Sequence, residues 1–175
     1  LYFTDDEQHL KLVDLQGKAS VEPIDGVTPG RRPAMRADHI TLAFDETGNT
    51  LDRSTLTGQA VAILSGGQSI EAPWLDIALA GDGAVVTAID ARSSVKVVLP
   101  AAGDEPARTI DAATLAARGD ETRGLTAARF DASPGQHVVF TERASRAGRA
   151  TVRTDARSRV LILGLDGSLD AMKDA

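Results

Sequence analysis

The fold of this chain is decided by residues 37–63. They begin Ala37-Asp38-His39-Ile40-Thr41-Leu42-Ala43-Phe44 and end Leu56-Thr57-Gly58-Gln59-Ala60-Val61-Ala62-Ile63. Large apolar residues alternate with small or polar ones in both arms, and a period of two predicts a strand with one buried face. Because residues 45–49 between the arms are rich in Asp, Gly and Asn, the stretch predicts a strand–turn–strand hairpin.

Copies of this hairpin recur along the chain. They occupy residues 72–79 with a return arm at 95–99, residues 112–117 with a return arm at 138–140, and a last copy from Ala156 onward; residues 15–21 match residues 56–62 as a half copy. The starts lie 35, 40 and 44 residues apart, which is typical of stacked units that cover one another's apolar faces. We therefore predict an all-β fold of stacked β-hairpin repeats, forming an elongated, partly open β-jellyroll.

One segment gives a mixed signal. Residues 110–128 are rich in alanine and would form a helix by propensity alone. The repeat register instead requires a strand there, and we predict a strand. The 175 residues are expected to form a single jellyroll domain, and the abrupt start and the stop inside a hairpin predict a fragment of a longer polypeptide.

Composition narrows the function. Apolar residues make up 42% of the chain but aromatic residues only 3%, so the core is expected to be aliphatic. The net charge of −6 argues against a nucleic-acid partner, because such proteins are normally basic. The absence of cysteine excludes disulfides, thiolate metal sites and a cysteine nucleophile. No apolar run in these residues approaches transmembrane length.

The charge is unevenly distributed, with an arginine-rich segment between residues 142 and 159. Its members are Arg143, Arg146, Arg149, Arg153, Arg157 and Arg159. A solvated strand face accounts for this series most simply, and contact with an anionic ligand is the alternative.

The alternation also predicts which side chains point inward. These residues are Ile40, Leu42, Phe44, Val61, Ile63, Leu75, Ile77, Leu79, Val95, Val97, Leu99, Leu115, Val138, Phe140, Leu161 and Leu163. They line either an apolar groove or a closed, dry core, and the sequence does not separate these two possibilities. Trp74 is out of phase with Leu75 and is expected outside or at the rim.

Residues that could carry catalysis are few and scattered. His9, His39 and His137 lack a second ligand at zinc-like spacing, so we expect no metal site. Nothing in the sequence brings Asp76, Asp90 and Asp111 together as paired acids for hydrolysis, and turns or strand edges explain them. We therefore predict no catalytic residues and no cofactor.

These observations lead to a family resemblance. The succession Ala-x-x-Ile/Leu-x-Leu, a turn, then Leu-x-Gly-x-Ala-Val resembles the periplasmic lipopolysaccharide-transport proteins of the LptA/LptC/OstA-like family. The matching stretches are residues 37–44 with 56–63, 72–79 with 88–99, and 109–140. The resemblance implies a folded β-jellyroll whose interior holds lipid acyl chains, and copies that join end to end through edge strands.

The leading hypothesis is therefore a non-enzymatic, periplasmic lipid-binding module that shields lipopolysaccharide acyl chains in a hydrophobic groove. The resemblance implies lipopolysaccharide or a similar lipid as ligand, other jellyroll-type transport proteins as partners, and homo-oligomers as a further option. A structural scaffold or adhesion module with a closed core is the alternative. A carbohydrate-active β-helix enzyme is a third reading, but shorter coils and clustered acids are expected of such enzymes.

Overall fold

The computed structural model describes residues 1–3, 9–22, 33–64, 66–81, 83–103, 105–144 and 152–167. These residues form eleven β-strands and no helix. The strands are β1 (Tyr2–Phe3), β2 (Leu10–Val21), β3 (Ala34–Phe44), β4 (Leu51–Ile63), β5 (Ser69–Ala80), β6 (Val85–Leu99), β7 (Ala107–Asp120), β8 (Gly124–Asp131), β9 (Val138–Ala144), β10 (Val152–Ser158) and β11 (Val160–Gly167). The predicted all-β fold is confirmed, and the alanine-rich segment 110–128 forms the second half of β7, a turn at residues 121–123 and the start of β8.

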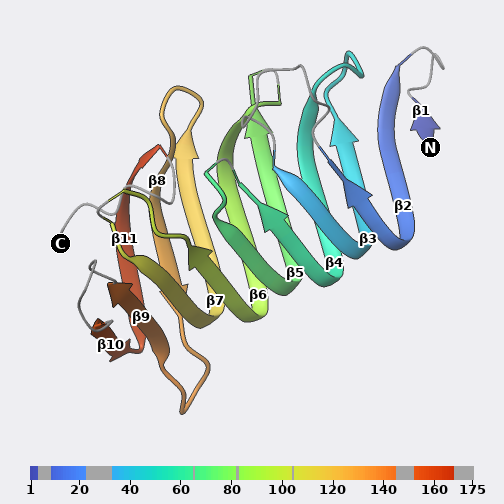
Figure 1. Ribbon diagram of the computed structural model, residues 1–175. Helices are drawn as coiled ribbons and strands as arrows, with labels where there is room; N and C mark the ends of the chain where they lie inside the picture. The colour runs from blue at the N-terminus through green and yellow to red at the C-terminus, as the bar shows by residue number, and fades with distance from the viewer. Residues whose placement is uncertain are drawn as a thin grey trace.

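All pairings in the sheet are antiparallel, and strands β1 to β8 pair in chain order. At β7 the sheet divides. The second half of β7 pairs with β8, which pairs in turn with β11. The first half of β7 pairs with β9, which pairs with β10. The sheet does not close on itself, so the molecule is elongated and open, with β1 and β11 at opposite ends (Figure 1).

A crease runs across the long strands near their middle. On β2, β4 and β6 it is formed by two successive residues with positive φ, which are Gly17-Lys18, Gly58-Gln59 and Ser93-Ser94. The pairing register shifts at each of these pairs, because the even-numbered strand carries one residue more than its neighbours there. An extra residue in one strand bends it and increases its twist. The crease therefore folds the long strands back on themselves.

The crease divides the sheet into two arms. Arm A consists of β8, β11 and residues 10–16, 39–44, 51–57, 74–80, 85–92 and 114–120. Arm B consists of β9, β10 and residues 19–21, 34–37, 60–63, 69–72, 95–99 and 107–112. Beyond β7 each arm is built from separate strands. The crease passes there through residues 132–137 and Arg159, where the Ala132 amide donates to the Arg159 carbonyl at 3.0 Å.

The predicted turn of the first hairpin is held by Asp45. Its Oδ1 accepts hydrogen bonds from the Asn49 amide at 3.1 Å and from the Thr47 hydroxyl at 2.9 Å. Its carbonyl accepts from the Gly48 amide at 3.0 Å. An aspartate that satisfies the backbone of the next residues is a common turn-former. The two strand segments of residues 37–63 thus form the predicted hairpin, and each is part of a longer strand.

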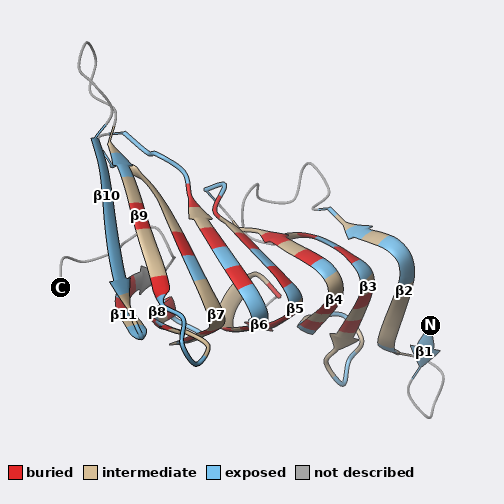
Figure 2. Cartoon of the chain, turned by 90° about the horizontal axis from the view of Figure 1, so that it is seen from below, coloured by how far each residue is buried: buried red, intermediate tan, exposed pale blue. Residues whose placement is uncertain are grey.

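Burial follows the fold. Buried residues recur as bands along the central strands, whereas β2 and β10 near the two ends are half-buried or exposed (Figure 2). In the described chain, no helix is long and apolar enough to span a membrane.

Candidate functional site

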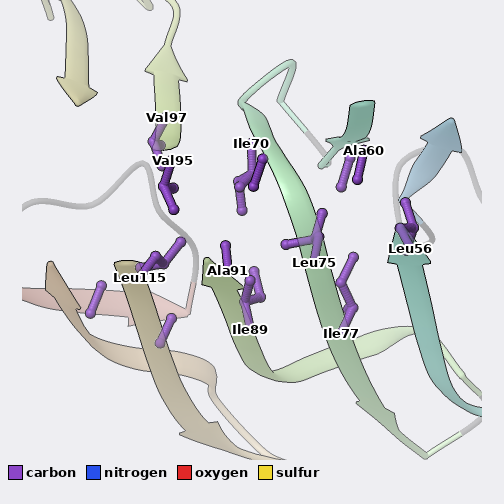
Figure 3. Packing of buried hydrophobic residues seen from close by; sticks show 14 of the residues in the cluster. Leu56, Ala60, Ile70, Leu75, Ile77, Ile89, Ala91, Val95, Val97 and Leu115 are labelled. Carbon is purple, nitrogen blue, oxygen red and sulfur yellow. The ribbon is translucent and has the colours of Figure 1, made fainter. Parts of the chain in front are cut away.

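The interior between the arms is lined by rows of apolar side chains that cross the sheet from strand to strand. In arm A one row contains Leu15, Ile40, Leu56, Leu75, Ala91, Leu115, Phe130 and Leu161. A row of arm B contains Val21, Met35, Ala62, Ile70, Val97, Ile110 and Phe140. Side chains of the two arms face one another across the interior (Figure 3).

Most of the predicted inward residues line this interior. Buried there are Ile40, Leu42, Leu75, Ile77, Leu79, Val95, Val97, Leu99, Leu115, Val138 and Leu163. Half-buried and packed against the same core are Phe44, Phe140 and Leu161. The alternation alone therefore identified a large part of the lining.

The predicted inward orientation of Val61 and Ile63 is wrong. Both are half-buried, and their neighbours in register are Arg36, Glu71, Ala34 and Ser69. The inward residues of this segment are Ala60 and Ala62, with 1% and 0% exposure. Ala62 lies between Met35 and Ile70 in its row, so a small residue fits between two large ones. The greater hydrophobicity of Val and Ile suggested the opposite face.

Sequence reasoning also missed part of the lining. The missed core residues include Met35, Leu56, Ile70, Ile89, Ile110, Leu125, Phe130 and Leu165. Ile70 is out of phase with Leu75, and Leu56 is out of phase with Val61, so a single period of two carried along each strand does not identify them. Phe130, which is fully buried, lies on β8, which the repeat pattern did not resolve as a strand of its own.

The interior is closed in the middle of the sheet and more open at the β2 end. Ile40, Leu75 and Ile77 have 0% exposure, so the arms pack directly against each other there. By contrast, Val13, Leu15 and Val21 on β2 are only half-buried, although they belong to the same rows. The core is therefore incompletely covered where the described sheet has its β2 edge.

At the rim of arm B, which is its edge farthest from the crease, the inward residues become partly polar. Gln68 is buried, and Leu99, Arg108 and Glu142 follow on the next strands. Arg108 donates from Nε to Glu142 Oε2 at 3.1 Å, and its side chain is only 17% exposed. The deep rows of arm B are apolar, whereas its rim carries the buried Gln68 and the Arg108–Glu142 ion pair.

Arm A contains one polar exception in its deep rows. Ser54 has 0% exposure and is flanked by Leu42 and Ile77 in its row. Its Oγ is the one buried side-chain nitrogen or oxygen among the described residues that has no hydrogen-bond partner.

The outer face of arm A is polar and carries ion pairs between neighbouring strands. Asp76, with 4% exposure, accepts from Arg53 Nε at 2.9 Å and from the Thr55 hydroxyl at 2.8 Å. The hydrogen bond to Asp76, followed by the charge of that carboxylate, raises the pKa of Arg53. Asp90, which lies opposite Asp76, pairs with Arg118 at 2.8 Å. Since each carboxylate has its own arginine, this arrangement favours ion pairing between strands over acid–base catalysis.

His39 and Trp74 also lie in this outer layer. His39 contacts Asp14 on β2, and this hydrogen bond, followed by that from Gln16, lowers the pKa of Asp14. Trp74 is half-buried beneath the guanidinium of Arg92, 4.6 Å from the ring centroid. It lies on the outer face as predicted. Among the described residues, no group of three or more His, Asp and Glu side chains could hold a metal ion.

The arginine-rich segment falls partly outside the described residues, since Arg146 and Arg149 are not among them. Arg143 and Arg153 are exposed and lie opposite each other on β9 and β10. Arg153 donates to Asp155 at 2.9 Å, which together with the Thr141 hydroxyl lowers the pKa of that carboxyl. The described part of the segment is thus a solvated strand face with local ion pairs.

Strand edges remain unpaired at both ends of the described sheet. β2 pairs on its outer side only with the two residues of β1, and β10 and β11 have no second neighbour among the described strands. Such edges offer backbone donors and acceptors to another strand.

Comparison of the chain with protein-family models, with curated proteins and with solved structures gives no match.

Proposed function

We propose that this chain is a non-enzymatic lipid-binding module that holds the acyl chains of lipopolysaccharide or a similar lipid between its two arms. The observation that carries the proposal is the apolar interior, whose rows run from β2 to β11 and end at a polar rim on arm B. Each methylene group that leaves water for such an interior contributes roughly 0.8 kcal/mol. Acyl chains therefore gain affinity without any catalytic or charged group.

The uneven burial of the interior supports the entry of a ligand at the β2 end. The half-buried residues at the β2 end offer apolar surface to an incoming chain, whereas the middle of the interior is filled by the protein's own side chains. A lipid that reaches the middle has to separate the arms. The crease, which is the line about which the arms meet, is where that change would be absorbed.

The strand directions at the two ends support end-to-end assembly with similar modules. In arm A, β2 runs toward the crease and β11 runs away from it; in arm B, β10 runs toward the crease and β2 runs away from it. A second copy aligned on the crease would therefore continue the antiparallel pairing in arm B, and in arm A once β1 leaves Leu10 and Leu12 of β2, and the two interiors would join. This is strand addition at exposed edges. Together with the family resemblance, this geometry supports the proposal that the module is part of a periplasmic lipid-transport bridge.

The second candidate is a scaffold module with a closed core. It is favoured by the 0% exposure of Ile40, Leu75 and Ile77, since a permanently packed interior binds nothing.

A lipid with a photoreactive group on its acyl chain separates the two candidates. The transport module should be labelled at inward sites such as Ile40, Phe44 and Ile77, and unlabelled competitor lipid should abolish the labelling. The outward residues Thr41, on the same strand as Ile40 and Phe44, and Lys96, on β6, are the internal controls. Labelling confined to them, or labelling that competitor does not reduce, supports the scaffold.

A further inference from the structure

The unpartnered hydroxyl of Ser54 is the feature of the interior that a purely hydrocarbon ligand leaves unexplained. Every other buried polar residue of the described chain has a partner. Asp76 binds Arg53 and Thr55, Thr141 donates to Asp155, and Gln68 is also engaged. Leaving a buried hydroxyl unsatisfied is costly, and an alanine or a larger aliphatic residue would avoid that cost.

The position of Ser54 points its side chain at the space between the arms. It shares a row with Leu42 and Ile77, both of which are inward, and it alternates with the outward Thr55. It lies three residues from the start of β4 at Leu51 and four from Gly58 in the crease. At about 3.3 Å per residue this places the hydroxyl roughly 10 Å below the rim of arm A. A group that meets it is therefore part of the ligand's chain and is separate from a head group held at the rim.

We propose that Ser54 selects acyl ligands that carry an oxygen function, such as a hydroxyl, along the chain itself. This inference rests on the proposed lipid-binding function and adds the chemical class of the ligand. A hydroxyl on the chain would donate to or accept from Ser54 Oγ, so that two polar groups that are each costly to bury alone satisfy one another. The flanking Leu42 and Ile77 contact the hydrocarbon on either side of that group.

The test compares two fatty acids, oleate and ricinoleate, which differ only in one mid-chain hydroxyl. Their affinities for the wild-type chain, for Ser54→Ala and for Thr57→Ala are measured by competition with a fluorescent fatty acid. Thr57→Ala is the matched control because it removes a hydroxyl from the outer face of the same strand. The wild type and Thr57→Ala should prefer ricinoleate about two- to tenfold. Ser54→Ala should lose or reverse that preference and keep its affinity for oleate.

A second measurement protects the result against a folding defect. Ser54→Ala should unfold at the same or higher urea concentration than the wild type, since it removes an unsatisfied buried group. A lower midpoint would mean that the hydroxyl already has a partner, and it would overturn the assignment. So would a ricinoleate preference that survives in Ser54→Ala, or a wild type without one. If neither fatty acid binds any variant, the proposed lipid-binding function fails and this assignment with it.

Discussion

Residues 10–120 and residues 124–167 build the same folded cross-section in two different ways. In the first region β2 to β7 pass through the crease, and three of these strands bend at pairs of residues with positive φ. In the second region the two arms are separate strands of seven or eight residues, joined at the crease by residues 132–137 or by Arg159. The cross-section is therefore specified by the register of the inward rows. A local bend motif is one of two ways to turn the chain between arms.

The comparison predicts that the largest effect comes from the crease of the continuous region. A Cβ at Gly58, which has φ +73°, would lie 2.8 Å from the Cβ of Asp38. Gly58→Ala combines the cost of a left-handed backbone with a steric clash and should lower the free energy of unfolding by about 2–4 kcal/mol. Gly17→Ala is the matched control, since Gly17 has φ +80° and no atom within 4 Å of the added Cβ. It should lose only about 1–2 kcal/mol in urea denaturation. Equal losses for both variants would contradict the role given to Asp38.

A smaller effect of opposite sign is expected on β6. Ser93 and Ser94 form the crease of β6, where β2 has Gly17-Lys18 and β4 has Gly58-Gln59. Their φ angles are 65° and 72°. Ser94→Gly removes a side chain from a left-handed conformation and should raise the free energy of unfolding by up to about 1 kcal/mol. Ser20→Gly, in the regular part of β2, should lower it by about 0.5–1 kcal/mol. If both substitutions destabilise the protein, the strain at the β6 crease is absent.

The smallest effect concerns the separate strands of the second region. Asp155 on β10 accepts from Arg153 and from Thr141 on β9, and these bonds depress its pKa from 3.8. A carboxyl with a depressed folded-state pKa stabilises the protein above its unfolded pKa, and this contribution disappears as pH falls through the folded value. Asp155→Asn should therefore lower the urea midpoint at pH 7, and the difference from wild type should shrink below pH 3.8. Asp52→Asn, which alters an exposed carboxyl on β4 with no partner among the described residues, should show little change at either pH. A difference at Asp155 that persists at low pH would exclude the ion pair as its cause.

Much of the fold was predictable because the alternation of large and small residues reports directly on the two faces of a strand. It gave Ile40, Leu42, Leu75 and Val97 their correct face. The bend at the crease was harder to predict. Residues 15–19 and 56–60 share a Leu-x-Gly-x-Ala pattern, but a glycine between two strand-like halves gives no indication of the fold angle.

The division of the sheet at β7 was not predictable from local pattern. It depends on which partner each half of β7 meets, and those partners lie far along the chain. The same holds for Ala62, whose small size is explained only by Met35 and Ile70 beside it. The Ser54 hydroxyl likewise becomes informative only when its surroundings are known, because serine on an isolated strand is unremarkable in either orientation.

The placement of β1 and β11 at opposite ends of the sheet has a consequence for how such a protein varies in size. Each further hairpin would lengthen the sheet by two strand spacings, about 10 Å, and leave the cross-section unchanged. Reach and width are therefore set independently: repeat number determines how far the protein extends, and the side chains of one cross-section determine what it accommodates. A protein of this shape can therefore vary in length by whole hairpins while its cross-section stays the same.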